Sequence, residues 1–114
     1  YLEIWSPELQ LLDGKWYIYF ALYNGISGEE RIFVLESLGI DPQGDYEFKG
    51  KLNIPTDRWA IDGSVLTTPD NKKYFIWSGW DEHTNIRQNI YIAAMENPWT
   101  ISSDRVCIST PEYE

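Results

Sequence analysis

One carboxylate in this sequence stands where it could do chemistry. Asp62 lies in the stretch Trp59-Ala60-Ile61-Asp62-Gly63-Ser64, between a tryptophan and a tight-turn signal at the expected mouth of a strand. A carboxylate held close to a second acid raises the pKa of that acid, because two negative charges repel each other. The same Asp-Gly pair is also common as a plain turn, so the residue types alone leave a catalytic and a structural interpretation open.

Aromatic rings are the second feature with chemical potential, since the chain holds six Trp and eight Tyr. Such rings fill β-sheet cores, and they also stack on sugars. Trp80 follows Ser78-Gly79 at the end of a predicted strand, where a ring face can stay open, whereas Trp77 in mid-strand is typical of a core residue. Trp5 and Trp59 flank two acidic segments, and both fit either the wall of a pocket or packing between sheets.

Glu8, Gln88 and Asn89 are candidates for binding a polar ligand through hydrogen bonds. Glu8 follows a proline at an expected strand start, where its carboxylate could accept hydrogen bonds from hydroxyl groups or hold a neighbouring group in place. Gln88 and Asn89 begin a later strand, and their amides can both donate and accept. All three residue types are also common at strand ends, so none of them identifies a site alone.

The charge balance excludes several classes of partner. Eighteen acidic against nine basic residues give a net charge of −9, which repels phosphate backbones and anionic membrane surfaces. No apolar run approaches the roughly 18 residues that a membrane span needs. We therefore expect neither nucleic acid nor membrane as a partner, while a neutral carbohydrate meets no such penalty.

Metal and cofactor chemistry find no support in the sequence. His83 is the single histidine, in a polar loop, and Cys107 is the single cysteine, so a histidine or cysteine cluster for a metal ion is missing. We expect His83 to be solvated and Cys107 to be a small core residue in a strand. Serine-nucleophile and phosphate-loop motifs are absent as well, so the predicted site contains no metal and no cofactor.

The segments that carry these residues have the patterns of β-strands in one compact unit. Asp13-Gly14 is a two-residue turn signal between 8–12 and 15–22, which predicts a hairpin with 15–22 as an inner strand covered on both faces. A third strand is predicted at 31–37. In 46–52 apolar residues alternate with charged ones, which predicts an edge strand with one face on the core and its lysines in water.

The chain begins with a lead-in at 1–7, which we expect to be a loop with Ser6 kept extended by Pro7. After a linker at 53–58 the second half of the chain repeats the plan of the first half. Further strands are predicted at 64–68, 72–77, 89–95 and 99–109. Tyr17 and Tyr74 lie 57 positions apart, slightly above the roughly 40–50-residue period of propeller blades. The fold class expected is therefore all-β, with two four-stranded antiparallel blade-like units at about 1–53 and 59–110.

Several of these motifs resemble glycoside hydrolase family 43. Trp5-Ser6-Pro7-Glu8-Leu9, followed by Asp13-Gly14-Lys15-Trp16-Tyr17-Ile18-Tyr19-Phe20, is similar to the family's Trp-Ala-Pro-Glu signature and its strand. Trp59-Ala60-Ile61-Asp62-Gly63 resembles the family's second acidic motif, and Tyr74-Phe75-Ile76-Trp77-Ser78-Gly79-Trp80 resembles its third-blade strand. The likeness covers nearly the whole chain in the family's order and is nearest to its α-L-arabinofuranosidases and arabinan-degrading enzymes.

The resemblance implies a five-bladed β-propeller of which this chain supplies about the second and third blades. Family members are inverting hydrolases that use a general base, a general acid and an aspartate that tunes the pKa of the acid. Asp62 matches the tuning aspartate, while the base is expected upstream of this segment and the acid downstream of it, before Gly-Pro. Glu112 and Glu114 are not followed by Gly-Pro, and we reject both as the acid.

We therefore expect a fragment of an inverting glycosidase that acts on arabinose- or xylose-containing polysaccharides and is most similar to an α-L-arabinofuranosidase. As an isolated chain it is expected to be inactive. Asp62 is its catalytic residue, and the predicted substrate-binding residues are Trp5, Glu8, Trp59, Trp80 and Gln88. The resemblance implies arabinan, arabinoxylan or a related oligosaccharide as substrate, and we expect an extracellular or secreted location. Two alternatives remain open: a non-catalytic carbohydrate-binding β domain, and self-association through open sheet faces.

Overall fold

The computed structural model describes residues 3–84 and 87–111, and all regular elements in these ranges are β-strands. They are β1 (Glu3–Leu12), β2 (Lys15–Tyr23), β3 (Arg31–Ser37), β4 (Tyr46–Lys51), β5 (Ala60–Thr67), β6 (Lys73–Trp80), β7 (Gln88–Asn97), β8 (Thr100–Ile101) and β9 (Val106–Ser109). Within the described residues no helix has the length and apolar character needed to cross a membrane. The predicted all-β class is confirmed.

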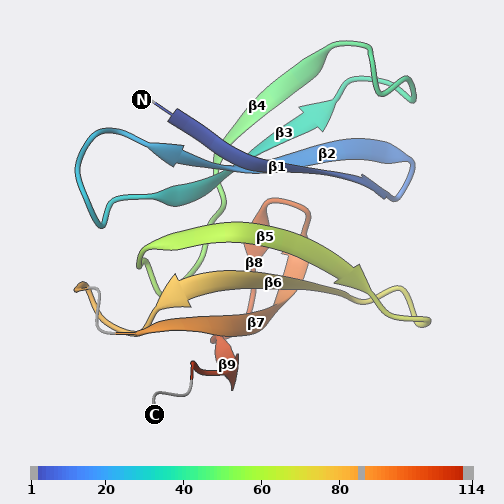
Figure 1. The fold of residues 1–114 in the computed structure, drawn as a ribbon. Helices are drawn as coiled ribbons and strands as arrows, with labels where there is room; N and C mark the ends of the chain where they lie inside the picture. The colour runs from blue at the N-terminus through green and yellow to red at the C-terminus, as the bar shows by residue number, and fades with distance from the viewer. Residues whose placement is uncertain (1–2, 85–86, 112–114) are drawn as a thin grey trace.

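The strands form two antiparallel sheets, one stacked on the other (Figure 1). The first sheet has the order β1-β2-β3-β4, and the second has the order β5-β6-β7-β8, with β9 also paired to β7. Strands that follow each other in the chain are mostly neighbours in space, as the closely spaced turn signals predict. Whether the two sheets correspond to separate units at about 1–53 and 59–110 stays a prediction.

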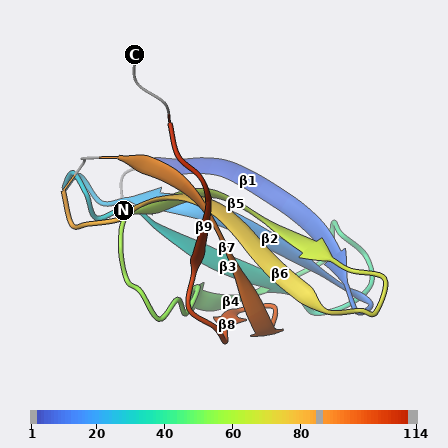
Figure 2. The ribbon, with the colours of Figure 1, turned by 90° about the horizontal axis from the view of Figure 1, so that it is seen from below.

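The main core lies between the two sheets. Its buried side chains come from both sheets and from the residues that link them (Leu12, Tyr17, Tyr19, Ile32, Val34, Leu52, Ala60, Val65, Phe75, Trp77, Tyr91, Ala93 and Ile101). Figure 2 shows that strands of the two sheets run in similar directions, which is typical of aligned sheet packing. Because side chains alternate along a strand, β2 presents Tyr17 and Tyr19 to this core and Phe20 to the opposite face.

The first hairpin forms as its turn signal predicts. Asp13 and Gly14 have φ angles of 51° and 83°, so both turn residues occupy the left-handed region that a type I′ turn requires. The turn joins Leu12 directly to Lys15 across the pair of strands. β2 is a central strand between β1 and β3, which confirms the prediction for 15–22.

β1 and β5 share an irregularity near their amino-terminal ends. The register with the neighbouring strand shifts at Ser6-Pro7 in β1 and at Asp62-Gly63 in β5. Ser6 and Asp62 have φ angles of 47° and 54°, so equivalent positions of the two sheets carry the same left-handed bulge. The internal repeat therefore extends to backbone detail.

The prediction for the lead-in at 1–7 is wrong. β1 already begins at Glu3, and Ser6 is left-handed instead of extended. The cause is tertiary, because pairing with β2 holds the chain both before and after the bulge. Two residues of β1, Ser6 and Pro7, lie opposite the single residue Phe20 of β2, and the one extra residue is accommodated as a bulge that bends the strand without ending it.

β4 is an edge strand as predicted, but two of its side chains lie on the opposite face of the sheet from the one predicted for them. Phe48 is 58% exposed and stacks on Phe33 on the outer face, with ring centroids 5.9 Å apart. Lys49 turns toward the core side, where its Nζ lies 4.1 Å from the centroid of the Trp99 ring. The register with β3 shifts here and leaves Lys49 as an extra residue, which reverses the alternation.

The predicted closing strand at 99–109 is also corrected. It is broken into β8 and β9, which pair with different parts of β7. Cys107, expected in the core, is exposed in β9. β9 runs along the outer edge of its sheet, where no further strand of the described chain covers it.

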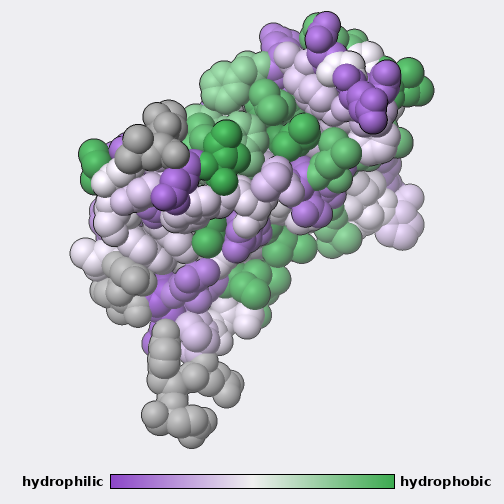
Figure 3. All heavy atoms as spheres, turned by 45° about the horizontal axis from the view of Figure 1, so that its top comes forward, coloured by the Kyte–Doolittle hydropathy of each residue, from purple (hydrophilic) through white to green (hydrophobic). Residues whose placement is uncertain are grey.

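The outer faces of the two sheets are partly apolar. Phe20, Leu22 and Phe33 form a second, buried cluster on the outside of the first sheet, beside the exposed Phe48, and Figure 3 shows apolar atoms interspersed with hydrophilic ones on one side of the molecule. On the second sheet Leu66 and Ile90 are 45% and 43% exposed. Exposed apolar area of this kind is typical of a surface that meets another element. Self-association through these faces remains a prediction.

An ion pair between the sheets leads to a prediction on pH. Lys73 Nζ lies 2.9 Å from Asp13 Oδ2, and this hydrogen bond, with the lysine charge, lowers the pKa of Asp13. A lowered pKa stabilises the fold above the unfolded-state value of about 4, and that stabilisation is lost as the pH falls. Lys73→Met should therefore reduce the loss of stability between pH 6 and pH 3, measured by urea unfolding.

The control for this experiment is Lys72→Met, which removes the same charge from a side chain that is 70% exposed and pairs with Asp70 at 3.8 Å. An exposed pair of this kind contributes little to stability. We expect Lys72→Met to keep the pH dependence of the unmodified chain. Equal flattening of the pH dependence by both substitutions would contradict the assignment to the Lys73–Asp13 pair.

Candidate functional site

The Asp62 bulge lies at one end of the stacked sheets. At the opposite end the Asp13 turn bonds to Lys73 at the start of β6. At the Asp62 end the backbone N–H of Ala60 donates to the carbonyl of Glu30, 3.1 Å away. The first tie joins the carboxyl-terminal ends of β1 and β5, and the second lies at the amino-terminal ends of both strands. β1 and β5 therefore run in the same direction. Their amino-terminal bulges therefore share one end of the molecule, which we call the bulge end.

Asp62 is exposed on the outer side of its bulge. Gly63, on the inner side, is buried so tightly that a Cβ there would stand 2.1 Å from a ring carbon of Phe75. Within the described residues the Asp62 carboxylate makes no hydrogen bond or ion pair. The local structure therefore presents a solvated carboxylate on a firmly packed support.

Glu8 and Trp5 lie at the same end, on either side of the β1 bulge. Glu8 is exposed directly after the bulge. Trp5 is half-buried and stacks on Tyr23 with ring centroids 5.6 Å apart, while its indole N–H donates to a carboxylate oxygen of Glu3 at 2.7 Å. The fold thus brings Trp5, Glu8 and Asp62 to one end, and the substrate-binding role of the first two stays a prediction.

Trp59 and Trp80 stack on each other, with ring centroids 4.9 Å apart and an interplanar angle of 14°. They are only 8% and 6% exposed, and a Cβ on Gly28 would stand 3.3 Å from the Trp80 ring. The open ring face expected for Trp80 is therefore not available in this chain, because Trp59 and the loop of Gly28 pack against it. Both rings lie at the bulge end as supports of that loop.

Gln88 and Asn89 point in opposite directions at the start of β7. Gln88 is exposed, donates through its amide to the hydroxyl of Ser78 at 2.6 Å, and lines a shallow pocket of about 460 Å³ on the outer face of the second sheet. Asn89 is 4% exposed, and its amide donates to the hydroxyl of Tyr91 at 3.1 Å. Gln88 therefore stays a candidate ligand-binding residue, whereas the burial of Asn89 does not fit contact with a sugar.

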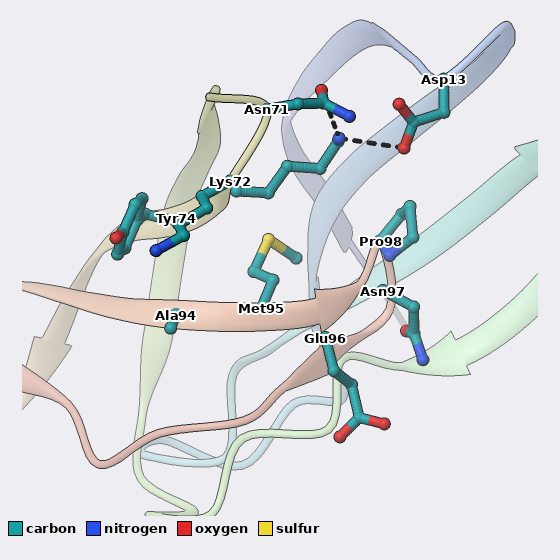
Figure 4. Close-up of a pocket in the computed structure, with 10 residues that line it drawn as sticks. Asp13, Asn71, Lys72, Tyr74, Ala94, Met95, Glu96, Asn97 and Pro98 are labelled. Carbon is teal, nitrogen blue, oxygen red and sulfur yellow. Dashed lines mark hydrogen bonds and ion pairs between the residues drawn. The ribbon is translucent and has the colours of Figure 1, made fainter. Parts of the chain in front are cut away.

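A pocket of about 450 Å³ lies at the other end, beside the turns (Figure 4). Its lining comes from the turns before β2, β6 and β8 and from the adjoining ends of β6 and β7, and it includes Asp13, Lys73, Tyr74 and Met95. Lys73 is held there between Asp13 and Asn71, whose side-chain oxygen accepts a hydrogen bond at 3.3 Å. Because Asp62 lies at the opposite end, this pocket and the candidate catalytic aspartate do not form one site.

Glu36 is a buried acid that sequence patterns did not mark as unusual. It is 7% exposed and accepts a hydrogen bond of 2.5 Å from the hydroxyl of Tyr17. Burial, and then this bond, raise the pKa of the Tyr17 hydroxyl. Lys15 and Lys49 lie 3.7 and 4.0 Å from the same carboxylate. With two cations and a hydroxyl as partners, Glu36 has the surroundings of a structural acid.

Gln10 is the residue of this region that sequence analysis missed. Its side chain reaches from β1 to the backbone of β5, where it bonds both the N–H and the carbonyl of Val65. No local signal could have identified this contact, because the two residues are 55 positions apart. A glutamine in a strand is otherwise an ordinary polar residue on an exposed face.

The described residues contain no group of three or more His, Cys, Asp or Glu side chains arranged to hold a metal ion. His83 is exposed in its loop, as expected. Glu112 and Glu114, which we rejected as the general acid, lie outside the described residues. The bulge end thus offers carboxylates and rings as its chemical groups.

What this end can do chemically follows from the number and placing of its acids. Inverting glycoside hydrolysis needs two carboxyl groups about 6.5–9.5 Å apart, on opposite sides of the scissile bond. Asp62 is carried as a solvated, unpaired carboxylate, which suits an electrostatic effect on a neighbouring acid. Glu8 lies at the same end, on β1. An acid and a base for the reaction remain to be supplied.

Comparison with known proteins gives a consistent result. The family model described as Glycosyl hydrolases family 43 matches residues 2–114. The chain is 37% identical to Alpha-L-arabinofuranosidase 43 of Humicola insolens, over 96% of this chain and 23% of that protein. It is 33% identical to an extracellular exo-alpha-(1->5)-L-arabinofuranosidase of Streptomyces chartreusis, over 98% of this chain and 34% of that protein.

A solved structure supports the same relationship. The alpha-L-arabinofuranosidase of Lactobacillus brevis superposes with a TM-score of 0.84 at 36% sequence identity, over 97% of this chain and 37% of that one. The chain therefore spans about a quarter to a third of the length of the curated relatives it matches.

Proposed function

Because this chain belongs to glycosyl hydrolases family 43, we propose that it contributes the Asp62-bearing pair of sheets to an α-L-arabinofuranosidase. The observation that carries the proposal is the family match over 2–114, together with the exposed carboxylate on the β5 bulge. The relatives at 37% and 33% identity are both named as arabinofuranosidases. The coverage of 23% and 34% of their lengths fits a contribution to a larger catalytic domain.

In this proposal Asp62 acts through its charge. A negative charge near a glutamic acid makes ionisation of that acid more costly, so the acid stays protonated near neutral pH and can donate its proton to the leaving oxygen. A second carboxylate would activate the attacking water on the opposite face of the sugar. Asp62 forms no bond to the substrate at any step.

The substrate class proposed is arabinose-containing polysaccharide, such as arabinan, arabinoxylan or a derived oligosaccharide. Uncharged pentose units suit a chain with a net charge of −9, which would repel an anionic polymer. Trp5 and Glu8, at the same end as Asp62, are proposed to border the sugar, with Gln88 on the adjoining face. Trp59 and Trp80 support this region from behind through their stacked rings.

We also propose that the protein acts outside the cell. The relative from Streptomyces chartreusis is named as an extracellular enzyme, and a polysaccharide too large to enter a cell is degraded outside it. Measuring arabinofuranosidase activity in the culture medium and in washed cells of the source organism tests the proposal. Activity confined to the cell lysate would contradict it.

The test of the proposed activity is hydrolysis of 4-nitrophenyl α-L-arabinofuranoside and of arabinan by the complete protein that carries this chain. We expect release of arabinose with inversion at the anomeric carbon, followed by proton NMR during the first turnovers. The isolated 114-residue chain, assayed beside it, is expected to be inactive because it holds one of the three acids. Failure of the complete protein to release arabinose would overturn the proposal.

A non-catalytic carbohydrate-binding module is the second candidate, and the burial of its expected platform weighs against it. A stacking platform needs an open ring face, yet Trp80 is 6% exposed and stacked on Trp59. Calorimetric titration with arabino-oligosaccharides distinguishes the two. A binding module would keep full affinity in Asp62→Asn and show no hydrolysis in the complete protein.

A further inference from the structure

From the contacts between β1 and β5, the first strands of the two sheets, we infer that Gln10 is the positioning residue for Asp62. This inference rests on the proposed function, because it concerns how the proposed catalytic aspartate is held. Gln10 lies in β1 and Asp62 in β5, and these strands belong to different sheets. No backbone ladder joins them, so side-chain contacts between the two strands, together with the backbone hydrogen bond from Ala60 to Glu30, set the distance between the two bulges.

Gln10 supplies the hydrogen bonds between β1 and β5 in the described part of the chain. Its amide N–H donates to the carbonyl of Val65 at 2.7 Å, and its carbonyl accepts from the N–H of Val65 at 2.6 Å. The hydroxyl of Ser64 approaches the same carbonyl at 3.5 Å. A primary amide has the donor and acceptor arrangement of a peptide group, so one side chain replaces a missing rung of sheet.

The position of this contact explains why it matters for Asp62. β5 is the edge strand of its sheet, and the backbone groups of Val65 that face away from β6 have no strand to pair with. Gln10 satisfies both groups, and unpaired buried backbone groups are costly. The contact lies just after the bulge at Asp62-Gly63, at the second residue of the resumed ladder between β5 and β6. It therefore fixes β5 directly after the point where its own ladder is interrupted.

The same contact also sets Asp62 relative to the β1 bulge. Gln10 follows Ser6 by four positions, and Val65 follows Asp62 by three, so the tie lies at nearly equal distance from both bulges. Strand registers are rigid over such a short span. A shift of β5 against β1 would move the Asp62 carboxylate relative to Glu8 and to any acid placed between them. Small displacements of catalytic groups greatly lower the reaction rate.

The experiment compares Gln10→Ala, Gln10→Glu and Asp62→Asn in the complete protein. Gln10→Ala should lower kcat about tenfold with little change in KM, because displacement affects the transition state more than binding. The alkaline limb of the pH profile should move to lower pH, because a displaced Asp62 raises the pKa of the general acid less. Gln10→Glu removes the donor and keeps the shape, so it should show the same shift. Gln43→Ala, an exposed loop glutamine, is the control and should change nothing.

The double variant Gln10→Ala/Asp62→Asn separates positioning from a general structural role. If Gln10 acts through Asp62, the double variant should be no slower than Asp62→Asn alone, since coupled residues are not additive. Multiplied losses of kcat, or an unchanged pH profile in Gln10→Ala, would overturn the inference. Either result leaves the proposed function standing as long as the unmodified protein hydrolyses arabinofuranosides.

A second measurement keeps the inference testable if the complete protein proves inactive. Hydrogen exchange followed by mass spectrometry should show faster exchange in a peptide covering 60–67 for Gln10→Ala, with 15–23 unchanged. The reason is that the Val65 N–H loses its acceptor while the β2 ladder stays intact. Unchanged exchange at 60–67 would show that Gln10 does not hold β5, and the inference would fail independently of any activity.

Discussion

Replacing Asp62 by asparagine should lower kcat of the complete protein about a hundredfold, at the lower end of what a positioned acid–base group contributes. Asparagine has nearly the same size and tolerates the left-handed region, so the bulge with φ of 54° should persist. Only the charge is removed. The pKa of the general acid should then fall, and the alkaline limb of the pH–rate profile should move to lower pH.

The matched control is Asp13→Asn. Asp13 also has a positive φ, of 51°, but it lies in the turn at the opposite end of the sheets. The two substitutions therefore change charge and backbone preference equally, and they differ in place and in the loss of the Lys73 ion pair by Asp13→Asn. Retained activity in Asp62→Asn, or an equal loss in Asp13→Asn, would contradict a specific role for Asp62.

Gly63→Ala should be the most destabilising single methyl addition in this region. The new Cβ would stand 2.1 Å from one carbon of the Phe75 ring and 3.0 Å from Ile32 Cδ1, both in the main core. Contacts this short force the neighbours or the backbone to move, which costs about 3 kcal/mol, the upper end for overpacking. For a domain of this size we expect a fall of about 10 °C in Tm.

The control for this effect is Gly39→Ala, since a Cβ at Gly39 would meet nothing within 4 Å. Thermal unfolding of both variants, followed by circular dichroism, measures the difference. Combining Gly63→Ala with Phe75→Leu should give less than the sum of the two separate losses, because the smaller side chain makes room. A Tm for Gly63→Ala within about 1 °C of the unmodified protein would show that the bulge is not packed as described.

The two effects have a common structural origin. The bulge that exposes Asp62 requires a residue without a side chain directly after it, because Phe75 fills the inner side. The position of the carboxylate and the packing of the core are therefore coupled through one peptide unit. A substitution that crowds the core at Gly63 should also displace Asp62, so we expect the fraction of Gly63→Ala protein that stays folded to have a lowered kcat as well.

Features that depend on neighbouring residues were predictable from the chain. Asp13-Gly14 forms its turn because both residues accept positive φ, and the strand at 31–37 appears with the predicted bounds. The edge position of 46–52 followed from its alternating lysines. The family motif around Asp62 identified the candidate site for a similar reason, since its residues are contiguous. Local conformational preference and alternation act over a few residues, and a sequence displays them directly.

Features that depend on contacts between distant residues appeared only in the folded chain. Trp80 is buried because Trp59, twenty-one positions away, stacks on it, and Lys49 turns inward because β3 forces a register shift. Gln10 meets Val65 across 55 positions, and Gly63 meets Phe75 only after the two strands have paired. Such contacts are selected by the packing of whole sheets, for which no short pattern exists. The residue types of the site were therefore readable from the chain, whereas its support, its exposure and its distance to the neighbouring strand were set by how the two sheets stack.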